Sequence, residues 1–215
     1  MKSEERHKLK ENDFAKLVQS LISWISDHAI LLLVLVVGAI LIITGSWYFS
    51  YTKEMKNDEA GKQIGQLMND LGVDSINNIS SEKISLLEDA VSKYKSTKNG
   101  AVYAYKLGSY FENNGKIDKA KEYYQISLEN LKNNNYVYHR LANLEIDNEN
   151  YKKALDYLKQ IDKSYEMYDN ILYLMYISAE KEGNKEIVTN IKKEFEKEEY
   201  KDSKYKKMLK IREAL

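Results

Sequence analysis

The chain has 215 residues with 33 basic and 33 acidic side chains, and it contains neither proline nor cysteine. Zero net charge argues against a nucleic-acid-binding protein, which needs a basic patch, and without cysteine no lipid can attach at an N-terminal Cys. Ordinary usage would supply about 11 prolines, so every segment is free to be helical. Apolar residues recur at spacings of three and four from residue 56 onward, without β-type alternation. An all-α fold is predicted.

Residues 1–28 form a charged tail that ends in an amphipathic segment. A helix over residues 14–25 would place six apolar side chains on one stripe: Phe14, Leu17, Val18, Leu21, Ile22 and Ile25. We expect this helix to lie along a membrane surface. Packing on the transmembrane helix of a partner is the alternative.

Residues 29–52 contain no charged side chain. About 20 apolar residues, each rising about 1.5 Å along a helix, cross the hydrocarbon layer. Trp24 lies near one end of the segment, and Trp47 and Tyr48 lie near the other, as interfacial aromatic residues do. The segment is longer than the apolar core of a cleaved signal peptide. It is therefore predicted to be a single-pass membrane anchor.

The basic residues that flank the anchor do not predict its orientation in the membrane. Among the nearest twenty residues on each side, the tail has Lys10 and Lys16, and the opposite side has Lys53, Lys56 and Lys62. This small difference leaves the positive-inside rule undecided. Both topologies stay open at this point.

Residues 53–215 are predicted to form one helical domain. A first helical hairpin, within residues 55–98, consists of residues 58–71 and 81–94. A last helix, residues 203–215, would place Tyr205, Met208, Leu209 and Leu215 on one side. Repeat arrays need terminal units with one polar face, so these two segments are expected to cap the domain.

Between the caps, the sequence repeats with a period of 34 residues, over 101–134, 135–168 and 169–202. One period relates Leu107 to Leu141 and Gly108 to Ala142. The same shift relates Ala120 to Ala154 and Tyr124 to Leu158. The third unit is weaker: it keeps Gly183, two periods after Gly115, but has Tyr176 where the others have a small residue. A period of this length indicates a solenoid of helical hairpins.

This unit resembles the tetratricopeptide repeat. In that family, small residues at positions 8 and 20 let helices A and B approach closely, and large apolar residues at positions 7, 11 and 24 fill their interface. Two family residues, Trp at position 4 and Pro near position 32, are missing here. The residues expected in this packing are Leu107, Gly108, Phe111, Ala120, Tyr124, Leu141, Ala142, Ala154 and Leu158.

The resemblance also implies a partner-binding groove, lined by helix-A positions 2, 5, 9 and 12. We call its expected lining the predicted groove: Val102, Tyr105, Ser109, Tyr136, His139, Asn143, Tyr173 and Ile177. Position 5 carries a ring in all three units, and aromatic rings are frequent anchors of binding. The abundance of tyrosine, 18 residues in the chain, is the competing explanation. These side chains are expected to lie outside the contacts between helices A and B.

Some tetratricopeptide co-chaperones hold acidic C-terminal peptides in a two-carboxylate clamp of lysine, asparagine and arginine. At the clamp positions this chain has Tyr105, Ser109, Arg140, Asn170 and Leu174. The departure from the clamp makes an Hsp70 or Hsp90 tail an unexpected ligand.

The layout of tail, amphipathic lead-in, one membrane helix and a tetratricopeptide domain resembles the ancillary subunit of the bacterial Sec translocon. The resemblance implies an inner-membrane protein with a cytoplasmic tail and periplasmic repeats. It also implies association with the SecYEG channel and with a membrane-anchored periplasmic chaperone of the prolyl-isomerase type. A holding chaperone for unfolded translocating chains, or a general cell-envelope assembly scaffold, is the alternative.

No catalytic motif is found. The three histidines, His7, His28 and His139, are isolated from one another, and no Gly-rich phosphate loop or nucleophile motif occurs. A non-enzymatic protein without a metal, cofactor or small-molecule substrate is therefore expected.

Overall fold

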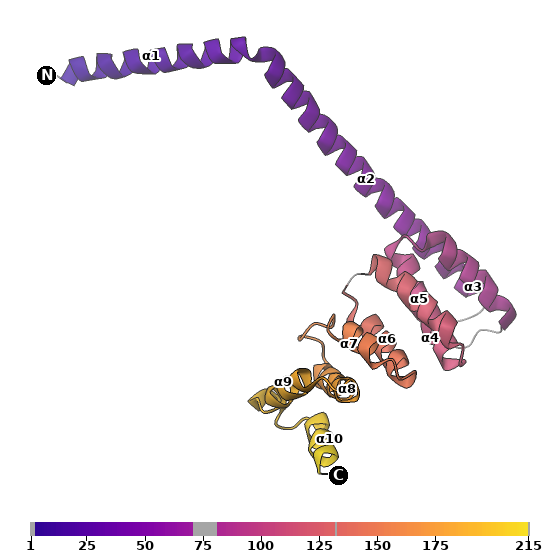
Figure 1. Ribbon diagram of the computed structural model, residues 1–215. Helices are drawn as coiled ribbons and strands as arrows, with labels where there is room; N and C mark the ends of the chain where they lie inside the picture. The colour runs from indigo at the N-terminus through magenta and orange to yellow at the C-terminus, as the bar shows by residue number, and fades with distance from the viewer. Residues whose placement is uncertain (1–2, 71–80, 132, 215) are drawn as a thin grey trace. The chain divides into compact units, whose positions relative to one another are not determined.

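The computed structural model of the protein describes residues 3–70, 81–131 and 133–214. All regular elements among these residues are helices, which confirms the predicted all-α class. The chain divides into two compact units, Met1–Glu54 and Met55–Leu215. In chain order (Figure 1), the elements are α1 Ser3–Asp27, α2 Ala29–Asp70, α3 Ser81–Tyr94, α4 Lys98–Asn113, α5 Ile117–Asn130, α6 Asn135–Asp147, α7 Tyr151–Leu158, α8 Tyr168–Lys181, α9 Lys185–Phe195, a 3₁₀ turn η2 Glu198–Tyr200, and α10 Lys204–Glu213.

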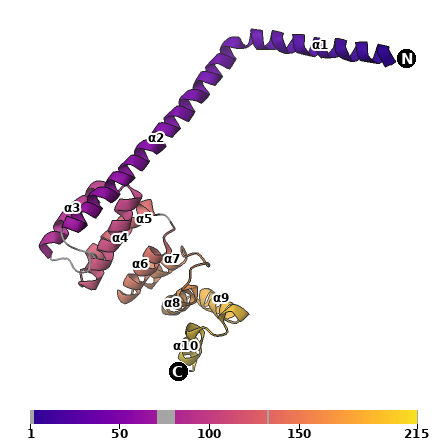
Figure 2. The ribbon, with the colours of Figure 1, turned by 180° about the vertical axis from the view of Figure 1, so that it is seen from behind.

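The N-terminal unit contains α1 and the first part of α2, which meet at an angle near His28 (Figures 1 and 2). The helical hydrogen bonds continue through this bend. The N–H of His28 donates to the carbonyl oxygen of Trp24 at 3.1 Å, and the N–H of Leu32 donates to that of His28 at 2.9 Å. The predicted stripe of apolar residues from Phe14 to Ile25 is exposed on α1. The helix is longer than predicted, because the residues before Phe14 are helical as well.

Helix α2 continues without a break past residue 53, where we expected the anchor to give way to the repeat domain. Nothing in the sequence ends the helix there, because the chain lacks the proline that would interrupt it. In the second unit, the buried residues of α2 recur every four residues and pack on α3. The shared apolar cluster contains Ala60, Ile64 and Met68 of α2 with Ile84, Leu87 and Val91 of α3.

Three helical hairpins follow, α4–α5, α6–α7 and α8–α9, and consecutive helices from α3 to α9 pack against one another. Figures 1 and 2 show the hairpins in succession along the second unit. Each hairpin lies largely within one predicted 34-residue unit, although α4 and α8 begin at Lys98 and Tyr168, before their units do. The nine residues predicted to pack between helices A and B are all buried: Leu107, Gly108, Phe111, Ala120, Tyr124, Leu141, Ala142, Ala154 and Leu158.

The turn between helices A and B repeats with the same period as the sequence. Gly115, Glu149 and Gly183, spaced by 34 residues, all have a left-handed backbone, with φ of 72°, 59° and 68°. In each hairpin the next residue donates its N–H back to the last turn of helix A over 2.8 Å, from Lys116, Asn150 and Asn184 in turn. A residue with positive φ followed by this bond is a common way to end a helix. The third hairpin therefore has the same turn as the other two, although its sequence match is weak.

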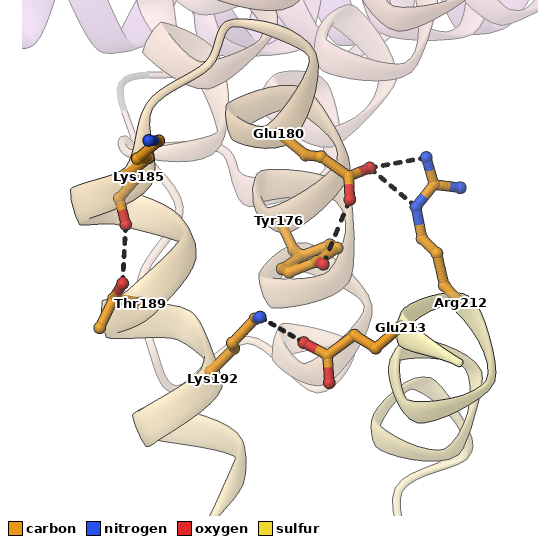
Figure 3. Close-up of polar contacts among 7 residues, drawn as sticks. All are labelled: Tyr176, Glu180, Lys185, Thr189, Lys192, Arg212 and Glu213. Atoms are coloured by element: carbon orange, nitrogen blue, oxygen red, sulfur yellow. Dashed lines mark hydrogen bonds and ion pairs between the residues drawn. The ribbon is translucent and has the colours of Figure 1, made fainter. Parts of the chain in front are cut away.

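The residues at positions 8 and 24 complement each other in size. In the first hairpin, fully buried Tyr124 fills the space left by Gly108, and in the second, Ala142 and Leu158 share one apolar cluster. The third hairpin differs, because both residues of the pair are large. Tyr176 occupies position 8, and the Nζ of Lys192 lies 5.9 Å from the centre of its ring (Figure 3). A long, flexible lysine thus accommodates the large residue that weakened the sequence match.

The last helix, α10, packs on α8 as a terminal cap. Leu209 is buried in the cluster formed by α8 and α9, and the ring of Tyr205 lies 5.7 Å from that of Tyr173. Met208 was predicted on the same side, but it is 43% exposed. Its position in the helix turns it away from Leu209, so this part of the prediction is wrong. Leu215 lies outside the described residues.

Candidate functional site

The predicted groove residues lie on the A helices of the three hairpins. Helix α4 carries Val102, Tyr105 and Ser109, helix α6 carries Tyr136, His139 and Asn143, and helix α8 carries Tyr173 and Ile177. None of these side chains is fully buried. Val102 and Tyr136, both at position 2, are the most accessible, with 40% and 49% exposure. They are therefore the two predicted groove residues with the most surface to offer a partner.

The rings at position 5 pack against other rings of the protein. Tyr105 contacts Tyr124 with 5.7 Å between ring centres, and Tyr173 contacts Tyr205 at the same separation. His139 lies 5.9 Å from Tyr165 in an edge-to-face arrangement. We expected these rings to lie outside the contacts between helices A and B. That expectation is wrong for Tyr105, because Tyr124 belongs to the interface of its hairpin. The position-5 rings thus contribute to the packing of the fold as well as to the predicted groove.

Tyr165 is a buried ring that supports this surface and that the sequence did not predict. It lies in the connector after α7, is 7% exposed, and meets the ring of Tyr136 edge-to-face at 5.3 Å. Its hydroxyl is 3.3 Å from Nδ1 of His139. Beside it, Tyr136 donates its hydroxyl hydrogen to Glu166 over 3.0 Å. No periodic signal marks this residue, because α7 ends early and the connector is irregular.

A charged pair links the A helices of the first two hairpins. Arg140 of α6 lies 3.4 Å from the carboxylate of Glu112 of α4, which also accepts a hydrogen bond from the hydroxyl of Tyr124. Arg140 stands at one of the positions of the two-carboxylate clamp. Because a carboxylate of the protein itself already occupies it, this arginine is not free to bind an acidic ligand as the clamp does.

Burial keeps the centre of the surface uncharged. It lowers the pKa of His139 below the ordinary value of 6.5, and the charge of Arg140 acts in the same direction, whereas a hydrogen bond with Asn170 opposes both. Burial also raises the pKa of Tyr165 to about 12. At neutral pH both rings are therefore neutral; His139 is partly exposed, whereas Tyr165 is buried and packs on Tyr136. Such a surface suits recognition of apolar groups and backbone amides rather than proton transfer.

In the N-terminal unit, the residues predicted at the membrane interface are exposed. Trp24, Trp47 and Tyr48 have more than half of their surface accessible. Helix α2 is long and apolar enough to cross a membrane, and the apolar part that qualifies it is not buried by the rest of the protein. The described residues contain no group of three or more His, Cys, Asp or Glu side chains placed to hold a metal ion.

A family model described as a tetratricopeptide repeat-like domain matches residues 23–169. The match covers more than half of the chain and includes the apolar part of α2, the hairpin with α3 and the first two repeats. No curated protein matches the chain. The repeat period, the three recurring turns and this match agree. The chain belongs to the tetratricopeptide repeat-like domain family, whose domains serve as protein–protein interaction modules.

Proposed function

We propose that this protein is a membrane-anchored interaction module, an ancillary subunit of the Sec translocon that links the SecYEG channel to a periplasmic chaperone. The observation that carries the proposal is the combination, in one chain, of a long helix whose uncharged, apolar part (residues 29–52) is not buried by the protein with a series of tetratricopeptide-repeat hairpins. The anchor would keep the repeats at the membrane, so that their partner meets the channel at a high local concentration.

The predicted groove is the proposed contact for the chaperone. Val102 and Tyr136 supply accessible surface, and the ring of Tyr136 packs edge-to-face on the buried ring of Tyr165, which His139 contacts in turn. Side chains that are already ordered lose little entropy on binding, which favours affinity. This neutral aromatic surface suits a folded partner segment with apolar side chains.

The same aromatic surface motivates a second candidate, a holding chaperone that itself binds unfolded chains as they leave the channel. Photo-crosslinking from position 102 in cells separates the two. We expect one dominant adduct for the translocon subunit, whereas a continuous smear of nascent chains would favour the holding chaperone. The same crosslinker at Tyr151, on the B helix α7, is the control, and an equal adduct there would exclude the predicted groove.

The proposed membrane orientation of the protein can be tested separately. With the tail in the cytoplasm and the repeats in the periplasm, protease added to intact spheroplasts should degrade the repeats and leave a protected fragment containing the tail and anchor. Detection with one antibody against each end of the chain distinguishes the fragments. Full protection of the repeats in sealed spheroplasts, with degradation after lysis, would overturn the assignment.

A further inference from the structure

Helix α1 has an apolar face that no described residue covers. It consists of the six residues of the predicted stripe, which we call the α1 stripe: Phe14, Leu17, Val18, Leu21, Ile22 and Ile25. Their exposure ranges from 41% at Val18 to 70% at Phe14. At about 3.6 residues per turn, the six side chains fall within about 140° of the helix circumference. A continuous apolar surface of this kind marks an interaction site, unlike apolar residues that are exposed singly.

The α1 stripe lies next to the segment proposed to cross the membrane. Its last residue, Ile25, comes four residues before Ala29, where α2 and the uncharged segment begin. At the bend between them, the rings of Trp24 and His28 stack with their centres 4.8 Å apart, and Nδ1 of His28 lies 2.8 Å from the carbonyl oxygen of Trp24. A tryptophan in such a place is typical of the lipid headgroup level. In an anchored chain, the stripe therefore begins at the surface of the bilayer; this step rests on the membrane anchoring proposed above.

The opposite face of α1 is polar but almost uncharged. Five residues form it: Lys16, Gln19, Ser20, Ser23 and Ser26. Asp13 and Asp27 bound the stretch, so residues 13–27 carry one positive and two negative charges. A helix that binds anionic lipids by charge is instead rich in lysine and arginine on its polar face. Electrostatic attraction therefore does not explain how α1 would be held on a membrane, and burial of the stripe has to supply the affinity.

We infer that the α1 stripe binds the lipid interface of the bilayer by apolar burial alone, with the serine-rich face toward water. To insert, the helix has to part the lipid headgroups, and no excess of positive charge draws it toward them. Its insertion then depends on how tightly the lipids pack and not on their charge. Because the anchor holds α1 near the bilayer, insertion is an intramolecular step that needs little affinity. The inference adds a lipid-binding surface that is separate from the predicted groove.

The test uses single labels on the full chain, which contains no cysteine of its own. The fluorophore NBD is attached after Leu21→Cys in the stripe, Ser23→Cys on the opposite face, or Ile40→Cys in the anchor, and each chain is reconstituted in vesicles of unsaturated phosphatidylcholine. Nitroxide lipids quench fluorophores that lie at the depth of the nitroxide. A nitroxide near the headgroup should quench the label at position 21 about threefold more strongly than the label at position 23, because an interfacial helix buries only its apolar face.

The label in the anchor separates this inference from the membrane anchoring on which it rests. A nitroxide deep in the acyl chains should quench the label at position 40. Absence of that quenching would contradict the anchor itself. Quenching at position 40 with equal quenching at positions 21 and 23 would overturn the inference about α1 alone. A label at position 21 that is shielded both from nitroxide lipids and from aqueous iodide would place the stripe against protein, on a second copy or on a partner's transmembrane helix, and would also overturn it.

Lipid composition tests the apolar character of the binding. Adding phosphatidylglycerol should leave quenching at position 21 within about twofold, whereas tightly packed saturated lipids with the same headgroup should reduce it about threefold or more. A requirement for phosphatidylglycerol, or equal quenching in saturated and unsaturated lipids, would contradict the inference.

Substitutions on the two faces complete the test. In the chain labelled at position 21, Phe14→Ser with Ile25→Ser removes apolar surface at both ends of the stripe and should reduce quenching about threefold or more. The matched control, Lys16→Ser with Gln19→Ser, changes two residues of the polar face and should leave quenching within about twofold. Equal loss in both double variants would contradict binding through the stripe.

Discussion

Replacing Gly108 with leucine should destabilise the repeat domain far more than the same change at Gly115. A Cβ atom at Gly108 would lie only 2.6 Å from two ring carbons of Tyr124. That ring cannot easily move, because it is fully buried, packs on Tyr105 and is hydrogen-bonded to Glu112. Overpacking of this kind costs roughly 1–3 kcal/mol or more. For a chain of this size, each kcal/mol lowers Tm by roughly 2–4 °C.

At Gly115, by contrast, a Cβ atom would meet no other atom within 4 Å. The cost of a leucine there is the left-handed backbone, with φ of 72°. The equivalent turn residue of the next hairpin, Glu149, already adopts φ of 59° without being glycine. Thermal unfolding of both variants, followed by circular dichroism of the full chain in detergent, makes the comparison. Equal Tm values for the two variants would mean that the 34-residue register is misplaced.

The hairpins could be predicted from sequence because their determinants are local and periodic. Small residues at positions 8 and 20 and large ones at positions 7 and 24 recur at fixed places on helices A and B, so self-comparison of the chain detects them. The turn at Gly115 and Gly183 is visible for the same reason, since glycine favours positive φ. The third hairpin was harder to predict, because the accommodation of Tyr176 by Lys192 depends on two residues that face each other only in the fold.

The periodic sequence pattern did not predict the buried charge of Glu145. It stands where the first repeat has Phe111, yet it is only 1% exposed. Its carboxylate lies 3.1 Å from Nζ of Lys121 on α5 and 2.9 Å from Nζ of Lys153 on α7, and it accepts a hydrogen bond from Asn150. Burial raises the pKa of Glu145, but these partners outweigh burial and hold it below the ordinary value. A buried charge is predictable only once its partners are placed, and Lys121 comes from the preceding hairpin.

The predicted groove follows from the resemblance to the tetratricopeptide repeat. The ring contacts seen in the structure decide which of its residues are best substituted to test it. Substituting the position-5 rings would also remove packing on Tyr124, Tyr165 and Tyr205, so binding and stability would change together. The connector that carries Tyr165 follows no repeat, which is why this ring could not be foreseen. Position 2 offers the two most exposed of the predicted groove residues, although Tyr136 also contacts the ring of Tyr165.

A double variant, Val102→Ser with Tyr136→Ser, should therefore lose its partner with a smaller fall in Tm than removal of the position-5 rings would cause. Interface energy concentrates in a few aromatic and apolar anchors. A loss of about 1.4 kcal/mol already weakens binding about tenfold. The matched control is Leu86→Ser with Tyr151→Ser, which removes one aliphatic and one tyrosine side chain from α3 and α7. Leu86 is 49% exposed, close to the exposure of Tyr136.

The central claim is that a membrane-anchored series of repeats binds its partner through the predicted groove. The amount of partner that co-purifies with each variant tests this claim most directly. The measurement is quantitative mass spectrometry of the full chain isolated from detergent-solubilised membranes. We predict that the SecYEG channel and the chaperone dominate with the unaltered chain and the control. With the groove variant, the chaperone should fall about tenfold or more. Equal recovery of the chaperone with groove and control variants, whether retained or lost, would contradict the claim.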